Sequence, residues 1–134
     1  MIFVDSNVLI DVAQADPVWG EWSEERFAEA FDSGEALVSN ILVYAELSRS
    51  FASTAALDIL LGQLQIELLN IPRDAAFAAS GAHQRYRRAG GTRAATLPHF
   101  FIAAHAHCLG ARLLTRDATR VRTYFPDLSV IAPA

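Results

Sequence analysis

Residues 1–9, MIFVDSNVL, decide the fold class, because a short apolar run ends there on an acid. Apolar runs of this length that are rich in β-branched and aromatic residues are typical of a buried strand in a parallel sheet. Open α/β sheets build their sites just beyond the carboxyl ends of such strands, which is where Asp5 falls. The stretch therefore predicts an α/β protein with a polar site at one edge of its sheet.

Two further acids lie in comparable surroundings. Asp117 closes a second apolar run, residues 111–117 (ARLLTRD), and Glu46 lies inside the apolar stretch 41–47 (ILVYAEL). Because parallel strands end at the same edge of a sheet, we expect Asp5, Glu46 and Asp117 to converge there. Two carboxylates 4 Å apart repel by about 4 kcal/mol at an effective dielectric near 20. A hard divalent cation, Mg²⁺ or Mn²⁺, would offset that repulsion.

Polar neighbours accompany the two strand-end acids. Ser6 and Asn7 follow the first acid directly, and Thr115 and Arg116 precede the second. Ser6, Asn7 and Thr115 supply neutral oxygens and donors that could orient water or a ligand. Arg116 is suited to hold a scissile phosphate or the carboxylate of an inhibitory partner, because its guanidinium binds such groups with two N–H donors.

Taken singly, each acid also has a purely structural interpretation. Asp5 and Asp117 could each cap the helix that follows. Glu46 could form a salt bridge with Arg49 or Arg116, since acids are rarely buried without a partner. One cation site accounts for all three acids at once, whereas the structural alternatives need three separate explanations.

Composition indicates one globular domain spanning residues 1–134. The chain is 52% hydrophobic and only 19% charged, which excludes a disordered chain. No apolar run approaches the roughly 20 residues of a membrane helix, and the N-terminus lacks the features of a signal peptide. The single cysteine, Cys108, excludes an internal disulfide framework and favours a reduced, cytoplasmic setting. Its apolar surroundings predict a core position.

The charges are divided unevenly along the chain. Residues 1–67 carry 12 acids and two arginines, whereas residues 68–134 carry three acids and nine arginines, and there is no lysine. The basic half could face RNA, an acidic partner chain or the acidic half of its own fold, and the choice of arginine could also reflect coding bias alone.

An arginine cluster with one aromatic residue flanks Gly90–Gly91: it comprises Arg85, Tyr86, Arg87, Arg88 and Arg93. Such a cluster suits single-stranded RNA, through phosphate contacts and base stacking. It is also compatible with a solvated helix end, where arginines interact favourably with the helix dipole.

Hydrophobic periodicity and turn residues predict strands that alternate with helices. Strands are expected near residues 2–5, 36–39, 66–69, 112–115 and 129–131. Helices are expected near residues 7–13, 17–31, 54–64, 72–88 and 99–109, and Asn40 is expected to cap a further helix that carries Glu46. The helix 17–31 would begin at the Asp16–Pro17 cap and pack Trp22, Phe27, Ala30 and Phe31 inward. This order predicts a central parallel sheet of four to five strands with helices on both faces and right-handed crossovers.

Four segments together resemble the PIN-domain family, and more narrowly the VapC-type toxins of type II toxin–antitoxin systems. They are residues 4–9 (VDSNVL), 43–47 (VYAEL), 97–106 (LPHFFIAAHA) and 113–117 (LLTRD). The resemblance implies an endoribonuclease that uses Mg²⁺ or Mn²⁺ and hydrolyses RNA phosphodiester bonds. It also implies a homodimer and a cognate antitoxin whose tail enters the active site. The family's acids correspond to Asp5, Glu46 and Asp117, and its polar helper to Thr115.

His99 departs from this pattern, because the family has an aspartate after the Leu–Pro pair. Imidazole is a poorer ligand for Mg²⁺ than a carboxylate, although it can bind metals. Three interpretations stay open. His99 is a natural or introduced change that weakens activity, a natural variant that favours Mn²⁺ or another softer metal, or a residue that merely caps or packs at the helix start.

Two functions therefore compete. In the first, the chain is a metal-dependent ribonuclease toxin. In the second, it is a catalytically impaired PIN-like protein that binds its antitoxin within a DNA-binding complex. A phosphoryl-accepting receiver domain would also gather acids at strand ends, but that family uses a lysine, and this chain has none.

Overall fold

The computed structural model describes residues 1–92 and 97–134, so Arg93 of the predicted arginine cluster lies outside the described residues. Its strands form one sheet in the order β3-β2-β1-β4-β5, with every neighbouring pair parallel. The strands are β1 (Ile2–Val4), β2 (Leu37–Asn40), β3 (Ile66–Leu69), β4 (Arg112–Leu114) and β5 (Val130–Ile131). The predicted parallel α/β architecture is confirmed.

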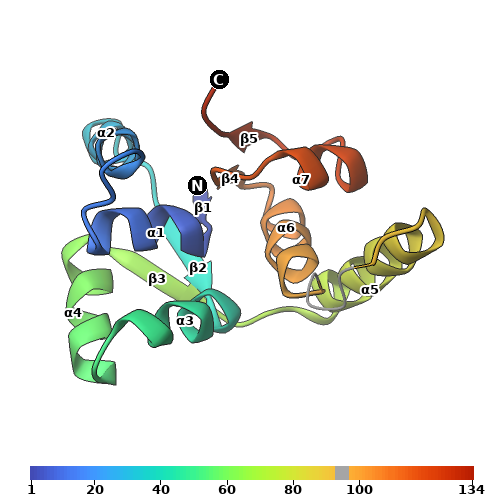
Figure 1. Ribbon diagram of the computed structural model, residues 1–134, viewed down its shortest axis with the longest axis horizontal. Helices are drawn as coiled ribbons and strands as arrows, with labels where there is room; N and C mark the ends of the chain where they lie inside the picture. Colours follow the sequence, from blue (N-terminus) through green and yellow to red (C-terminus); the bar gives the residue numbers. More distant parts are fainter. Residues whose placement is uncertain (93–96) are drawn as a thin grey trace.

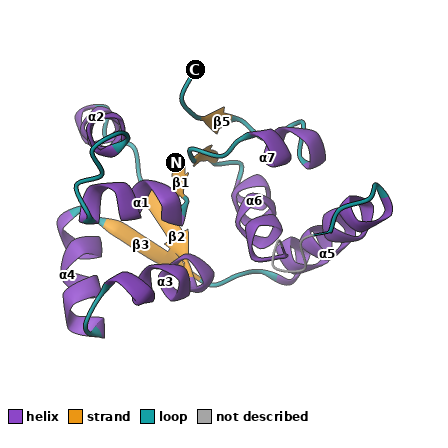
Figure 2. Ribbon diagram, viewed as in Figure 1, coloured by secondary structure: helices purple, strands orange, loops and turns teal. Residues whose placement is uncertain are grey.

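Helices cover both faces of this sheet (Figure 2). They are α1 (Ser6–Ala13), α2 (Gly20–Asp32), α3 (Ile41–Leu47), α4 (Thr54–Gln63), α5 (Arg73–Arg88), α6 (Leu97–Leu109) and α7 (Thr119–Tyr124), with a 3₁₀ turn at Ser48–Ser50. Right-handed crossovers place α1 to α4 on one face and α5 to α7 on the other, as the two groups in Figure 1 show. None of the described helices has the length and apolar character needed to cross a membrane.

The central strand β1 sets the position of the first acid. All three of its residues are buried, and Ile2 pairs with Leu37 of β2 on one side and with Arg112 of β4 on the other. The backbone N–H of Asp5 still donates to the carbonyl of Leu114, at 3.0 Å. The carboxyl ends of β1 and β4 therefore lie side by side, as the sequence predicted.

Asn40 links the two helices that carry Glu46 and His99. Its side-chain oxygen accepts hydrogen bonds from the backbone N–H groups of Leu42 (3.0 Å) and Val43 (3.2 Å) and so caps α3. Its amide nitrogen lies 3.1 Å from Nδ1 of His105 on α6, in a buried contact. Because the amide nitrogen can only donate, the His105 ring accepts through Nδ1. This contact fixes α3 against α6.

Three local predictions were wrong. The carboxylate of Asp16 accepts from the N–H groups of Val18 and Trp19, both at 2.8 Å, which closes a tight turn and delays the regular helix to Gly20. Phe31 does not pack inward, because it lies at the open end of α2 with 72% of its surface exposed. Cys108 is exposed rather than in the core.

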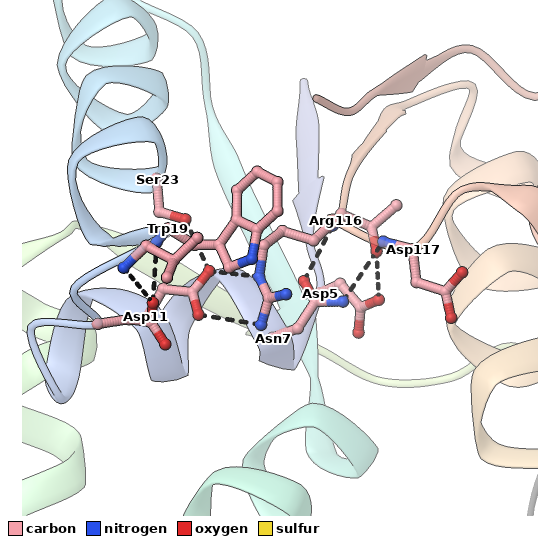
Figure 3. A network of polar contacts seen from close by, with 10 residues as sticks. Asp5, Asn7, Asp11, Trp19, Ser23, Arg116 and Asp117 are labelled. Atoms are coloured by element: carbon pink, nitrogen blue, oxygen red, sulfur yellow. Dashed lines mark hydrogen bonds and ion pairs between the residues drawn. The ribbon is translucent and has the colours of Figure 1, made fainter. Parts of the chain in front are cut away.

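A buried ion pair joins α1, α2 and the segment after β4. The Asp11 carboxylate accepts from Arg116 Nε at 2.6 Å, from Arg116 Nη2 at 3.1 Å and from the Ser23 hydroxyl at 3.0 Å. The side chain of Asp11 is 1% exposed and that of Arg116 is 29% exposed. The guanidinium also lies over the Trp19 ring, 5.5 Å from its centroid (Figure 3).

We expect Asp11→Ala to lower the free energy of unfolding by about 2 kcal/mol, because it leaves the Ser23 hydroxyl and a half-buried guanidinium without their acceptor. Urea denaturation measures the change. Glu25→Ala is the matched control, since its ion pair with Arg26 lies at the surface and should contribute less than about 0.5 kcal/mol. Equal stability of the two variants would show that the buried pair does not hold the helices together.

Candidate functional site

Asp5 is held firmly at the end of β1. One carboxylate oxygen accepts from the Ser6 backbone N–H at 2.7 Å and from the Ser6 hydroxyl at 3.4 Å, which caps α1. The other oxygen accepts from the Thr115 hydroxyl at 2.8 Å. The prediction that Asp5 could cap the following helix is therefore confirmed. Capping occupies one oxygen of the carboxylate, and the other oxygen accepts from the Thr115 hydroxyl.

The Thr115 hydroxyl is the centre of a small polar network (Figure 3). It accepts from the Asn7 amide nitrogen at 3.1 Å and from the backbone N–H of Asp117 at 3.2 Å. Its single proton is therefore directed to Asp5. The Asn7 oxygen accepts from the backbone N–H of Arg116 at 3.2 Å, so both ends of the amide are used in holding this loop.

Glu46 reaches the same edge of the sheet from α3. Its Oε1 atom is buried and, among the described residues, has no hydrogen-bond partner. Burial raises the pKa of this carboxyl, and the negative charge of Asp5 raises it further. The charge of His99, the Ser6 hydroxyl and the charge of Arg49 act in the opposite direction. Glu46 and Asp5 are thus close enough for their charges to interact.

In the described part of the chain, Glu46 does not form the salt bridge with Arg49 or Arg116 that would explain it structurally. Arg116, one of the two candidate partners, pairs with Asp11 instead. Arg49 influences the Glu46 pKa through its charge but makes no ion pair with it among the described residues. A half-buried carboxylate beside a second carboxylate, with one oxygen unsatisfied, is unusual unless something binds there.

A small cavity adjoins this cluster. Four polar residues line it, namely Asp5, His99, Asp117 and Arg120, together with the apolar Phe100, Ile102, Leu113 and Val121. Its volume is about 20 Å³, which is enough for one water molecule or one ion. Asp117 and His99 are exposed, so the cavity opens toward solvent on their side.

The donor set fits a hydrated divalent cation, although it is not a closed metal cage. Within residues 1–92 and 97–134, no three His, Cys, Asp or Glu side chains are grouped closely enough to enclose a metal ion. Mg²⁺ usually keeps several waters and uses only one or two protein carboxylates. The unsatisfied carboxylate of Glu46, which interacts with the charge of Asp5, and the two cavity-lining acids Asp5 and Asp117 match that requirement, although Glu46 itself does not line the cavity. His99 adds a softer nitrogen at the cavity.

The structure does not bring Arg116 into this site. Its backbone leaves β4 next to Asp117, but Figure 3 shows its side chain directed away from Asp117, toward Asp11 and Trp19. Arg120, which the sequence did not single out, lines the cavity instead. The available signal was its closeness to Asp117 in the sequence, since Arg120 lies in the first turn of the helix that follows this acid.

Comparison with known proteins adds the family. Similar solved structures are VapBC2 from Rickettsia felis bound to a DNA fragment from its promoter (18% identity, TM-score 0.75, 98% of each chain) and VapBC-1 from nontypeable Haemophilus influenzae (20%, 0.73, 98% of each chain). A toxin–antitoxin complex from Klebsiella pneumoniae is also similar (19%, 0.67, 100% of this chain and 98% of that chain). At these identities the likeness concerns the fold alone. No curated protein matches the chain.

The sequence itself decides the family. The profile of the PIN domain matches residues 2–126, a range that includes β1 to β4 and every acid of the candidate site. The chain therefore belongs to the PIN domain family.

Proposed function

We propose that this chain is a divalent-metal-dependent endoribonuclease and the toxin of a toxin–antitoxin pair. The observation that carries the proposal is the unsatisfied, half-buried Glu46 carboxylate beside Asp5, at a cavity that Asp117 also lines. Membership of the PIN domain family supports it, as does the likeness in fold to a solved toxin–antitoxin complex. A cognate antitoxin, a homodimer and a cytoplasmic setting complete the proposal.

Each residue of the site has a role in this mechanism. Asp5, Glu46 and Asp117 would hold Mg²⁺ or Mn²⁺, which when bound supplies an activated water and counter-charge for the phosphate. Thr115 fixes the Asp5 carboxylate by its hydrogen bond. Ser6 steadies the same carboxylate from the other side, and Asn7 orients the Thr115 hydroxyl. Ser6 and Asn7 thus position the acids rather than contact the substrate.

Nuclease assays on single-stranded RNA test this function directly. We expect cleavage with Mg²⁺ or Mn²⁺, none with EDTA, and at least about 100-fold slower cleavage by Asp5→Asn, because it removes a charged metal ligand. Asp127→Asn removes a comparable acid at an exposed position and should leave the rate unchanged. Cleavage that persists in EDTA, or in Asp5→Asn, would refute a metal mechanism at this site.

Glu46→Gln should stabilise the metal-free protein by about 1 kcal/mol at neutral pH, since it replaces an unsatisfied, repelled carboxylate with a neutral amide. The folded-state pKa of Glu46 lies above its ordinary value of 4.5. The charged form therefore costs stability that grows as pH rises above 4.5, and the gain should disappear below that value.

Thermal melts over a pH series measure this gain. Added Mg²⁺ should raise the melting temperature of the wild-type chain and much less that of Glu46→Gln, since only the former retains the ligand. If the variant is no more stable at neutral pH and responds equally to Mg²⁺, Glu46 is not a metal ligand.

His99→Asp should raise Mg²⁺ affinity about tenfold and increase RNA cleavage, because it places a carboxylate where imidazole now lines the cavity. Isothermal titration and the RNA assay report the two effects. His107→Asp adds the same charge to an exposed position of α6 and serves as the control. If the wild type and His99→Asp bind Mg²⁺ and cleave RNA equally, the side chain at this position does not limit activity.

A second function is favoured by His99 alone. Its imidazole lines the cavity where the PIN family pattern has an acid, so the chain could act chiefly by binding an antitoxin within a DNA-binding complex. The two functions differ in the nuclease assay. An interaction module stays inactive with Mg²⁺ and Mn²⁺ and gains activity, if at all, only as His99→Asp.

A further inference from the structure

Apart from the counter-charge that a bound metal would supply, no side chain of the candidate site is assigned to the charge of the substrate. An RNA phosphodiester is anionic, and Asp5, Glu46 and Asp117 would repel it. The residue expected to attract it, Arg116, is occupied by Asp11, by two hydrogen bonds of 2.6 and 3.1 Å. The side chain that would assist the metal in attracting the phosphate must therefore be a different one.

Arg120 has the required position. It belongs to α7 and lines the same cavity as Asp5 and Asp117. Among the described residues no carboxylate lies within ion-pair distance of it, although two acids line the cavity with it. Its guanidinium therefore keeps its donors available at the point where a phosphate would approach.

Tyr86 holds this arginine in place. The Arg120 guanidinium carbon lies 5.4 Å from the centroid of the Tyr86 ring, in a cation–π arrangement. The ring in turn packs against Phe100 at 5.7 Å and Tyr124 at 6.0 Å, so it forms part of an aromatic cluster. Gly91 borders the same ring so closely that a Cβ atom there would collide with it. The ring beneath Arg120 is therefore closely packed.

We propose that Arg120 is the residue that contacts the phosphate of the RNA substrate, positioned for this by its cation–π contact with Tyr86. The inference rests on the proposed nuclease function. A guanidinium that lies over an aromatic ring still has N–H donors directed away from the ring, and two of them match the oxygens of a phosphate. Tyr86, which the sequence suggested as a base-stacking residue, instead supports Arg120 with its ring.

The test compares Arg120→Ala with Arg122→Ala, which removes an exposed arginine from the same helix. Binding of a fluorescent single-stranded RNA of about 12 nucleotides is followed by anisotropy in EDTA, so that no metal-dependent cleavage intervenes. We expect Arg120→Ala to weaken binding about tenfold and Arg122→Ala no more than about twofold. Arg120→Lys should fall between Arg120→Ala and the wild type, because it keeps the charge but not the paired donors.

A second pair of variants tests the role of the ring. Tyr86→Phe keeps the aromatic face and should bind RNA like the wild type, whereas Tyr86→Leu should weaken binding as Arg120→Ala does. Adding Arg120→Ala to Tyr86→Leu should then cause little further loss, because both act through one contact. Circular dichroism confirms that each variant is folded, and full additivity of the two losses would overturn the positioning role.

The outcomes separate this inference from the proposed function. If the wild type binds RNA but Arg120→Ala binds as well as Arg122→Ala, the assignment of Arg120 is wrong. If Arg120→Ala instead tightens Mg²⁺ binding and leaves RNA binding unchanged, Arg120 is only a counter-ion for the acids, and the assignment is again wrong. RNA binding that depends on Arg120, without cleavage even in the His99→Asp background with Mn²⁺, would refute the nuclease and leave the phosphate contact standing.

Discussion

The Thr115 hydroxyl joins two strand ends that are 110 residues apart in the sequence. It accepts from Asn7 and from the backbone of Asp117, so its one proton can go only to Asp5. This network holds the buried Asp5 carboxylate through uncharged hydrogen-bond donors. A valine at position 115 would preserve the shape but leave the Asn7 amide and the Asp5 oxygen unsatisfied. The orientation of the Asp5 carboxylate thus depends on the uncharged Thr115 hydroxyl.

The two charged residues that follow β4, Arg116 and Asp117, have different surroundings. Arg116 turns toward the acidic first half of the chain, where Asp11 receives it, while Asp117 remains exposed at the cavity. Arg112 likewise pairs with Glu35 across the sheet. Two arginines of the basic half therefore face the chain's own acidic half, one of the alternatives that the charge distribution left open. Exposed arginines at the end of α5 remain outside such pairs among the described residues.

The sequence predicted the architecture because each strand is a short apolar run and the acids end two of those runs. It could not predict which arginine serves which acid, since that depends on the path of the loop after β4 and on the burial of Asp11. It also placed the start of α2 too early, because the Asp16 side chain competes for the backbone N–H groups of the first turn. The buried contact of Asn40 with His105 has no sequence signal, because it joins residues from two faces of the fold.

His99 and a bound cation act on Glu46 in the same direction. Each supplies positive charge that favours the ionised carboxyl, whose pKa burial and Asp5 otherwise raise. Positive charge at His99 would therefore offset part of the repulsion between Glu46 and Asp5, and it would also repel a metal ion. A carboxylate at this position would instead add negative charge to the cluster and attract the cation. The residue at position 99 therefore sets how much of the negative charge of Asp5 and Glu46 is left for a cation to offset.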